Sequence, residues 1–251
     1  MGNRPSNPTA KQELSELQRK AKTEAALVAG GTGSPTSSSQ PAQRNFTLQE
    51  LSTFNGEDPD KPVYVSLLSD VYDVTADFQD YKPNGGELHV LAGRDASRAV
   101  ALMSLVEDEA KSTELSDLSD TQLESLNKWV RKFNEEKKYP KVGRLLLFQD
   151  FRRDQLRPFN GVDNLRHTVL VGLNRNVYDV TLFGWEHYGP EGGYARFAGR
   201  DASRALACMS FLDEYLDNPT LDELTEDQRT ALINWASRFD QKYPVIGSIV
   251  D

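Results

Sequence analysis

The sequence is poor in the residues that build covalent frameworks or clustered metal sites. Its 251 residues include one cysteine, Cys208, and three histidines. A single cysteine excludes a disulfide framework and a cysteine-cluster metal site, and we expect Cys208 to be a small buried side chain on a helix. The sequence also lacks a nucleophile–base–acid set and a phosphate-binding glycine loop. We therefore expect no catalytic activity.

Long apolar runs and excess positive charge are also missing. No run approaches the roughly 20 residues that span a bilayer, and no apolar signal-peptide region lies near the start. The net charge of −9 argues against nucleic acid, because phosphate binding needs a basic face, and fits a basic protein partner. The start, residues 1–6, matches the myristoylation pattern M-G-x-x-x-S. We expect a cytoplasmic protein, held peripherally on endomembranes if Gly2 is acylated, with an unmodified tail as the alternative.

The first 45 residues predict a flexible N-terminal tail and linker. Residues 30–44 are rich in glycine, serine and proline and cannot bury a core. Residues 10–28 place apolar side chains at helical spacing. This stretch is either an anchor or partner helix, or a fraying helix in a mobile arm.

The remainder of the chain is an internal repeat. The stretch Ala92–Ala99 recurs unchanged as Ala198–Ala205, and Tyr72–Thr75 recurs as Tyr178–Thr181. Aromatic and K-Y-P positions further along match in nearly the same register. The repeat predicts two domains, residues 46–148 and 151–250.

Within each copy, short strands and helices alternate, which predicts an α+β fold. The expected elements are a capped helix over 47–54, hairpins over 63–67 with 71–74 and over 168–173 with 177–180, helices that begin near Asp95 and Asp201, helices over 120–134 and 225–240, and last strands at 142–143 and 246–247. A loop rich in glycine and proline is expected between the second strand and the A-G-R-D-A-S-R segment.

Five motifs follow one another in the second copy: Y-D-V-T, Y-G-P-E-G-x-Y, A-G-R-D-A-S-R, W-x-x-x-F and K-Y-P-x-x-G. With them, the chain resembles the membrane-associated progesterone receptor family over residues 46–250. The resemblance implies two tandem cytochrome b5-like domains after the tail, and haem binding. Ordinary b5 domains hold haem between two histidines, yet neither copy contains H-P-G-G. The family instead uses one tyrosine. Its common N-terminal membrane-spanning helix is not matched here.

The resemblance also implies a set of site residues in the second copy. Tyr194 is the expected axial ligand of the iron, Tyr188 hydrogen-bonds it or lines the pocket, and Lys242 with Tyr243 closes the other side near a propionate or the haem edge. A phenol has a pKa near 10 and ligates iron as the phenolate, which favours the ferric state. We interpret A-G-R-D-A-S-R as structural, with Asp201 as a helix cap and Arg200 paired with an acid or a propionate.

The first copy lacks that ligand. Counted without a gap from A-G-R-D-A-S-R, Leu88 takes the place of Tyr194; if Tyr81 is aligned with Tyr188, Glu87 takes it. Either alignment predicts one haem per chain, in the second copy. His89 is an alternative iron ligand, although we favour a surface position. The first copy then serves as an interaction domain, or holds an apolar ligand in the vacant pocket.

Together these features imply a non-catalytic haem-binding protein that regulates haem- or sterol-related redox partners such as haem-thiolate monooxygenases. A sterol-like ligand and a homodimer through the haem face are further expectations. The alternative is a haem-free adaptor that binds proteins or a sterol. A third, electron transfer like that of true b5, is disfavoured by the missing histidine pair.

Overall fold

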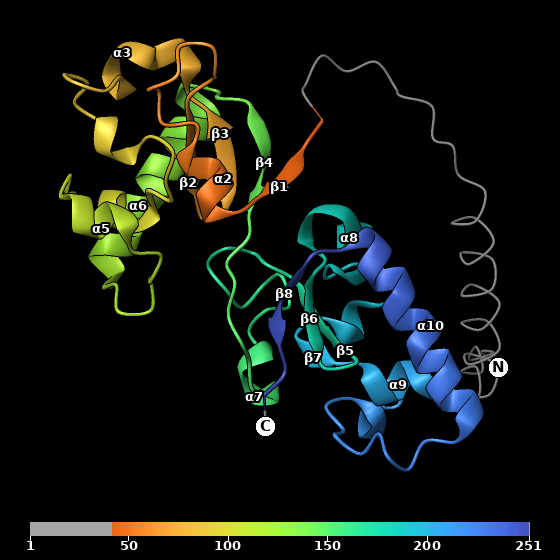
Figure 1. The fold of residues 1–251 in the computed structure, drawn as a ribbon. Coiled ribbons are helices and arrows are strands. Elements are labelled where there is room, and N and C mark those ends of the chain that lie inside the picture. Colours follow the sequence, from red (N-terminus) through yellow and green to blue (C-terminus); the bar gives the residue numbers. More distant parts are fainter. Residues whose placement is uncertain (1–41, 251) are drawn as a thin grey trace, which may run out of the picture. The chain divides into compact units, whose positions relative to one another are not determined.

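Two short mixed sheets, one in each repeat, organise the chain. The computed structural model describes residues 42–250, so the predicted tail helix over 10–28 and the Gly2 site lie outside the described residues. In the first repeat the sheet has the strand order β1-β4-β3-β2, and in the second the order β7-β5-β6-β8 (Figure 1). Within the described part, no helix has the length and apolar character needed to cross a bilayer.

The elements of the first repeat are β1 Arg44–Phe46, α2 Leu48–Ser52, β2 Tyr64–Leu67, β3 Asp70–Asp73, η1 Thr75–Asp77, α3 Phe78–Tyr81, η2 His89–Leu91, α4 Ser97–Ala101, α5 Glu107–Lys111, α6 Asp120–Arg131, the π-helical turn η3 Lys132–Glu136 and β4 Lys141–Leu145. Those of the second are α7 Arg153–Leu156, β5 Leu170–Leu173, β6 Asn176–Asp179, α8 Thr181–Tyr188, η4 Ala195–Phe197, β7 Arg200–Asp201, α9 Ser203–Ala207, η5 Asp213–Tyr215, α10 Glu226–Lys242 and β8 Val245–Ser248.

The two repeats share one topology, although some pairings are too short to be strands in both. The parallel pair β5–β7 of the second repeat corresponds to the bridge between Ser66 and Asp95 in the first. Conversely, β1–β4 of the first corresponds to the bridge between Phe151 and Ile249. The sequence repeat is therefore also a structural repeat.

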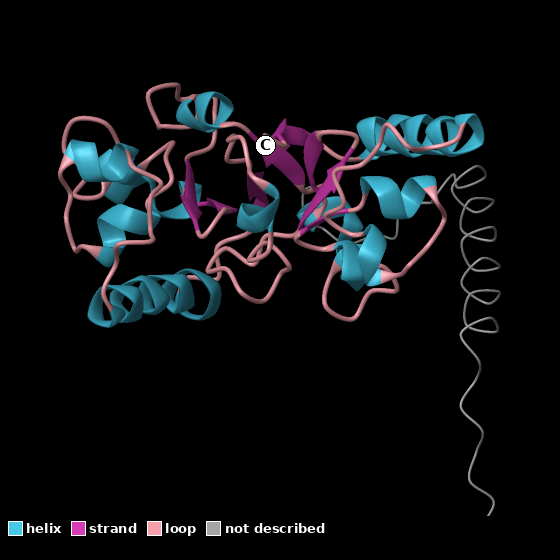
Figure 2. Cartoon of the chain, turned by 90° about the horizontal axis from the view of Figure 1, so that it is seen from below, coloured by secondary structure: helices cyan, strands magenta, loops and turns pink. Residues whose placement is uncertain are grey.

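Each sheet buries both faces. One face carries the larger core, in which Tyr178 and Val180 of the second repeat pack against Phe239 of α10. The other face carries a smaller cluster that includes Leu156 of α7 and Val177. In Figure 1 the helices of each repeat lie beside its own strands, and Figure 2 shows helices on both sides of the strands.

Local sequence explains where several elements begin. The Thr47 hydroxyl accepts a hydrogen bond from Glu50 N at 3.1 Å, and the Glu50 carboxylate accepts one from Thr47 N at 2.8 Å. This reciprocal capping box fixes the start of α2. Thr225 and Gln228 form the same arrangement at α10. The predicted N-cap at Thr47 is confirmed.

The A-G-R-D-A-S-R segment attaches a helix to the strand hairpin. Ser97 Oγ accepts a hydrogen bond from Leu68 N at 2.8 Å, and Ser203 Oγ accepts one from Asn174 N at 2.8 Å. Both donors open two-residue turns with positive φ, which are the turns that match strand twist. The segment is structural, as interpreted from the sequence.

Two expectations about that segment need refinement. Helix α9 begins at Ser203 with Ala202 at the N-cap, and no side chain caps it from that position. Asp201 lies one residue earlier, in β7, and its carboxylate still accepts a hydrogen bond from Ser203 N at 3.0 Å. Cys208, expected to be buried on a helix, is half-buried at the C-cap of α9.

Candidate functional site

Three tyrosine side chains meet in the second repeat. Tyr188 is the last residue of α8, Tyr243 is the C-cap of α10, and Tyr194 precedes η4. The ring centroid of Tyr188 lies 5.9 Å from that of Tyr194 and 6.0 Å from that of Tyr243. Tyr188 and Tyr243 are buried, whereas Tyr194 is half-buried. Residues separated by up to 55 positions in the sequence therefore form one cluster.

The fourth residue singled out from the sequence, Lys242, lies at the rim of this cluster. It ends α10 and is exposed. Its Nζ is 5.2 Å from the centroid of the Tyr243 ring. The ammonium group can therefore reach an anionic group at the edge of the cluster while it remains in water.

A flat aromatic wall borders Tyr194. Its ring stacks with Phe197 at 5.9 Å and with Phe211 at 6.0 Å, with interplanar angles of 17° and 19°. The Phe197 and Phe211 rings are 5.4 Å apart and nearly parallel. No motif in the sequence singles out these two phenylalanines together. Phe197 stands directly before the A-G-R-D-A-S-R segment, which is the signal that was available.

Burial disfavours the charged form of Tyr243. Removal from water raises the pKa of Tyr243 to about 12, because the charged phenolate is disfavoured there. A phenolate at this site at neutral pH needs a bound cation to stabilise it.

Close backbone approach explains two glycines of the Y-G-P-E-G-G-Y segment. A Cβ on Gly192 would lie 2.2 Å from the His187 carbonyl oxygen, and one on Gly189 would lie 2.6 Å from the Trp185 oxygen. The segment folds back on α8, where Tyr194 N donates to His187 O at 2.8 Å. The chain's own backbone therefore requires glycine at positions 189 and 192.

The segment also begins differently from the expectation. Residues 181–188 form helix α8 rather than a loop, so Tyr188 is held by a helix end. Within α8, a Cβ on Gly184 would lie 3.0 Å from Tyr243 Cε1 and 3.1 Å from Tyr188 Cδ2. Gly184 thus leaves space for the two buried rings.

The first repeat places Leu88 where the second places Tyr194. Leu88 N donates to Asp80 O at 2.8 Å and precedes η2, as Tyr194 N donates to His187 O and precedes η4. Like Tyr194, Leu88 is half-buried, whereas Glu87 is exposed. Of the two alignments left open by the sequence, the structure selects the ungapped one.

Tyr139 of the first repeat, which corresponds to Tyr243 in the K-Y-P motif, makes a different contact. The Tyr139 hydroxyl donates to the Asp77 carboxylate, which also pairs with Lys137 Nζ at 2.7 Å. Hydrogen bonds from Lys137 and Tyr139 lower the pKa of Asp77. The second repeat has Phe183 at the corresponding position. An ionised acid thus occupies the first repeat where the second has an aromatic ring.

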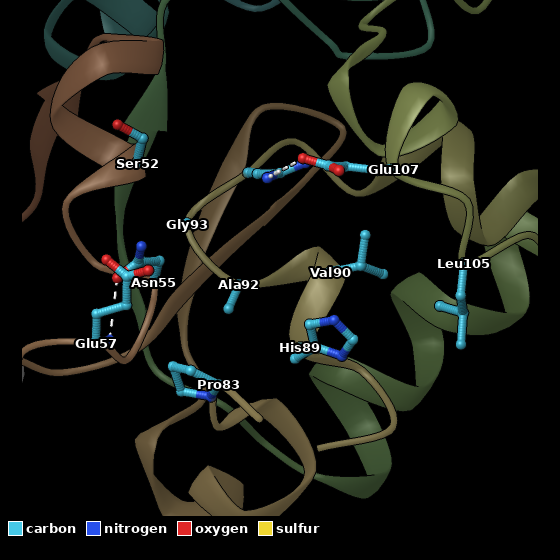
Figure 3. Close-up of a pocket in the computed structure, with 11 residues that line it drawn as sticks. Ser52, Asn55, Glu57, Pro83, His89, Val90, Ala92, Gly93, Leu105 and Glu107 are labelled. Carbon is cyan, nitrogen blue, oxygen red and sulfur yellow. Dashed lines mark hydrogen bonds and ion pairs between the residues drawn. The ribbon is translucent and has the colours of Figure 1, made fainter. Parts of the chain in front are cut away.

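His89 faces a separate hollow in the first repeat. The hollow is about 390 Å³ and is lined by His89 with Pro83 and Leu105, among others (Figure 3). The Arg94–Glu107 ion pair crosses it, and the His89 side chain hydrogen-bonds the Gly86 carbonyl through Nδ1 at 2.8 Å. Neither Tyr81 nor Tyr139 lines this hollow. His89 is exposed, as favoured from the sequence.

The arginine of the second A-G-R-D-A-S-R segment is already paired. Arg200 Nε donates to the Asp217 carboxylate, and Arg157 pairs with the same carboxylate at 2.7 Å. Of the two roles predicted for Arg200, pairing with an acid is therefore observed.

The chemistry of the tyrosine cluster fits a haem better than a bare metal ion. Among the described residues, no group of three or more histidine, cysteine, aspartate and glutamate side chains could hold a metal. The cluster instead offers a half-buried phenol, a stacked aromatic wall and a lysine at the rim. These are a hard oxygen donor, a surface for a flat macrocycle and a cation for its carboxylates.

Comparison with known proteins identifies both repeats independently. The family model described as "Cytochrome b5-like Heme/Steroid binding domain" matches residues 47–146 and again residues 152–247. The two matches together cover more than half of the chain.

Similar proteins cover one repeat or slightly more. The chain is 35% identical over 137 residues to "Cytochrome P450 regulator dap1" of Schizosaccharomyces pombe, covering 50% of this chain and 77% of that protein. It is 42% identical over 101 residues to "Probable steroid-binding protein 3" of Arabidopsis thaliana, covering 40% and 97%. It is 40% identical over 107 residues to human "Membrane-associated progesterone receptor component 2", covering 41% of this chain and 45% of that protein.

Among solved structures, a hypothetical protein from Arabidopsis thaliana with a cytochrome b5-like fold is 37% identical. The match covers 44% of this chain and 98% of that one, with a TM-score of 0.38. The relatives are named as regulators, receptors and binding proteins. On the two family-model matches and the identities to these relatives, the chain belongs to the cytochrome b5-like haem/steroid-binding domain family and carries two of its domains in tandem.

Proposed function

We propose that the second repeat binds one ferric haem through Tyr194, and that the chain acts as a non-catalytic regulator of haem- or sterol-related redox partners. The observation that carries the proposal is the cluster of Tyr188, Tyr194 and Tyr243 beside the Phe197–Phe211 wall. Bound iron would supply the cation that stabilises the Tyr194 phenolate.

Each residue of the cluster then has a defined task. Tyr194 donates its phenolate oxygen, and Tyr188, whose ring lies beside it, orients and hydrogen-bonds it. Tyr243 closes the pocket as a neutral phenol, in keeping with its raised pKa. Lys242 pairs with a propionate at the rim. A single hard anionic ligand favours the ferric state, so reduction weakens binding.

The first repeat contributes no second haem site under this proposal. Leu88 offers no donor atom, and Asp77 holds the Tyr139 hydroxyl and places a negative charge beside the pocket. A haem propionate would be repelled there.

The regulatory part of the proposal rests on charge and on relatives. The net charge of −9 favours a basic docking surface on the partner, and one similar protein is named as a regulator of cytochrome P450. Haem-thiolate monooxygenases are therefore the proposed partners. A sterol-like ligand, a homodimer through the haem face and peripheral endomembrane attachment through Gly2 stay predictions.

A haemin titration followed by absorbance tests the haem site. We expect wild-type full-length protein to saturate at about one haem per chain with a Soret shift. Tyr194→Phe should weaken binding at least about tenfold, which corresponds to about 1.4 kcal/mol, because the donor oxygen is lost. Tyr64→Phe, the same chemical change in the first repeat, should leave the titration unchanged.

Dithionite added to the loaded protein should release haem. No Soret shift in the wild-type protein would contradict the haem proposal and favour the haem-free adaptor. Equal binding by wild type and Tyr194→Phe would remove Tyr194 as the ligand.

A further inference from the structure

A cavity of about 430 Å³ lies where the two repeats meet. Its apolar lining comes from both, and includes Leu48, Leu115, Leu147 and Phe148 from the first and Phe159 and Leu165 from the second. None of the tyrosines of the haem-site cluster lines it. The cavity is a product of the tandem arrangement, and a single repeat does not contain it.

Exposed apolar side chains converge on this cavity. Phe148 is 58% exposed, Leu48 is 46% exposed and Leu165 is 42% exposed. They come from three separate segments, yet all three line the same space. A concave site with mostly apolar walls and a few polar groups is the usual form of a small-molecule pocket, and gathered exposed apolar surface marks binding sites.

Two arginines fix the walls of the cavity. Arg166 reaches from the second repeat to the buried Asp95 carboxylate and to Thr113 O, both at 2.8 Å. Arg144 of the first repeat donates to Arg166 O at 2.9 Å and to Asp70 at 3.0 Å. The two bonds donated by Arg166 and the bond from Arg144 to Arg166 O cross the junction between the repeats, so the cavity is formed in advance of any ligand.

The polar groups of the cavity select the charge of the ligand. Arg166, the arginine of the lining, is paired with Asp95, and Arg144, which lies outside the lining, is paired with Asp70, so neither guanidinium is left to neutralise an anionic ligand. The lining includes Asp179, which is only 8% exposed, and burial raises its pKa. An anion would be repelled by the Asp179 carboxylate, whereas a neutral hydroxyl can donate a hydrogen bond to that carboxylate and a carbonyl oxygen can accept one from the Thr168 hydroxyl.

We propose that the junction cavity binds one uncharged, largely apolar small molecule that carries a hydroxyl or carbonyl oxygen. The apolar body lies against Leu48, Phe148 and Leu165, and the oxygen points toward Asp179 and Thr168. The site does not depend on haem.

Nile red is a suitable probe, because it is uncharged, mostly apolar and carries one ring carbonyl. We expect saturable binding of about one dye per full-length chain by fluorescence. Leu165→Glu and Phe148→Glu should each weaken it at least about tenfold, by placing a charge in the cavity. The matched control is Ile233→Glu on α10, because the Ile233 side chain is 63% exposed and lies outside the cavity lining. This variant should bind the dye with unchanged affinity.

A haemin titration of Leu165→Glu should match wild type, which shows that the variant is folded and that the two sites are separate. The proposal is overturned if wild type binds no dye saturably, if Ile233→Glu loses as much affinity as Leu165→Glu, or if haemin displaces the dye. Binding that appears only after residues 1–41 are removed would also overturn it, because the chain's own N-terminal segment would then be the occupant.

Discussion

One residue position distinguishes the two repeats most sharply. Leu88 and Tyr194 make the same backbone hydrogen bond at the same place in the fold. They differ in the side chain, which is aliphatic at Leu88 and a phenol at Tyr194. The proposed division into one haem-binding and one haem-free repeat therefore depends on a small number of side chains, with Asp77 against Phe183 as the second difference.

Leu88→Tyr should raise the haemin endpoint from one to about two haems per chain, the added site being the weaker because Asp77 remains. The control is Glu87→Tyr, one residue earlier, which is exposed and should leave the endpoint at one. A second site created by Glu87→Tyr and not by Leu88→Tyr would mean that the gapped alignment describes the pocket.

At the scale of elements, the glycine of the K-Y-P-x-x-G motif is explained by a close approach between two segments of the same chain. A Cβ on Gly143 would lie 1.7 Å from the Arg44 carbonyl oxygen, and one on Gly247 would lie 1.7 Å from that of Gln149. The segment that opens each repeat thus lies directly against its last strand. No sequence period carries this information, because the contact joins residues about 100 positions apart.

Gly247→Ala should lower the free energy of unfolding by about 2–3 kcal/mol, since the backbone must shift to admit the methyl group. Gly193→Ala is the matched control, because a Cβ there would meet nothing within 4 Å. Urea unfolding followed by circular dichroism compares the two. Equal stability of the two variants would contradict the close approach at Gly247.

Elements with strong local signals could be predicted from the sequence. The capping box at Thr47, the hairpins and α10 are set by residues adjacent in the chain. Helix α8 could not be predicted, because Gly184 and the aromatic residues around it weaken its helical pattern and tertiary packing decides its structure. The π-helical turn η3 also escaped prediction. It absorbs two extra residues so that Tyr139 N still reaches Phe133 O, as Tyr243 N reaches Phe239 O.

The site could be predicted only through the family resemblance. Tyr188, Tyr194 and Tyr243 were chosen by resemblance, and the structure brings them together. Their roles toward haem stay predictions, as do the domain limits at 46–148 and 151–250. Phe197 and Phe211 were missed because a stacked wall has no sequence period.

At the scale of the whole molecule, the buried aspartate at equivalent positions of the two repeats is paired with arginines from different places. Asp201 pairs with Arg153 of its own repeat at 3.0 Å, whereas Asp95 pairs with Arg166 of the other repeat at 2.8 Å. The Asp95 side chain is 1% exposed and that of Arg166 is 12% exposed. A buried carboxylate that loses its partner is costly, about 3–5 kcal/mol.

Arg166→Met should therefore lower the free energy of unfolding by about 3–5 kcal/mol. Urea unfolding measures this change on the first transition. Arg196→Met removes an exposed ion pair with Asp213 and should change stability little. Asp95→Asn combined with Arg166→Met should recover part of the loss, because the unpaired charge is gone. No recovery in the double variant would show that Arg166 acts through packing rather than charge.

The pairing of Asp95 with Arg166 also bears on the order of events during synthesis. The ribosome makes the chain from the N-terminus, so all of the first repeat is complete before residue 166 is added. During that interval Asp95 has no guanidinium, and the first repeat cannot reach its final stability. The first repeat becomes fully stable only after the beginning of the second repeat has been synthesised. A ribosome that stalls between the two repeats therefore leaves a nascent chain in which the buried Asp95 carboxylate is unpaired with Arg166.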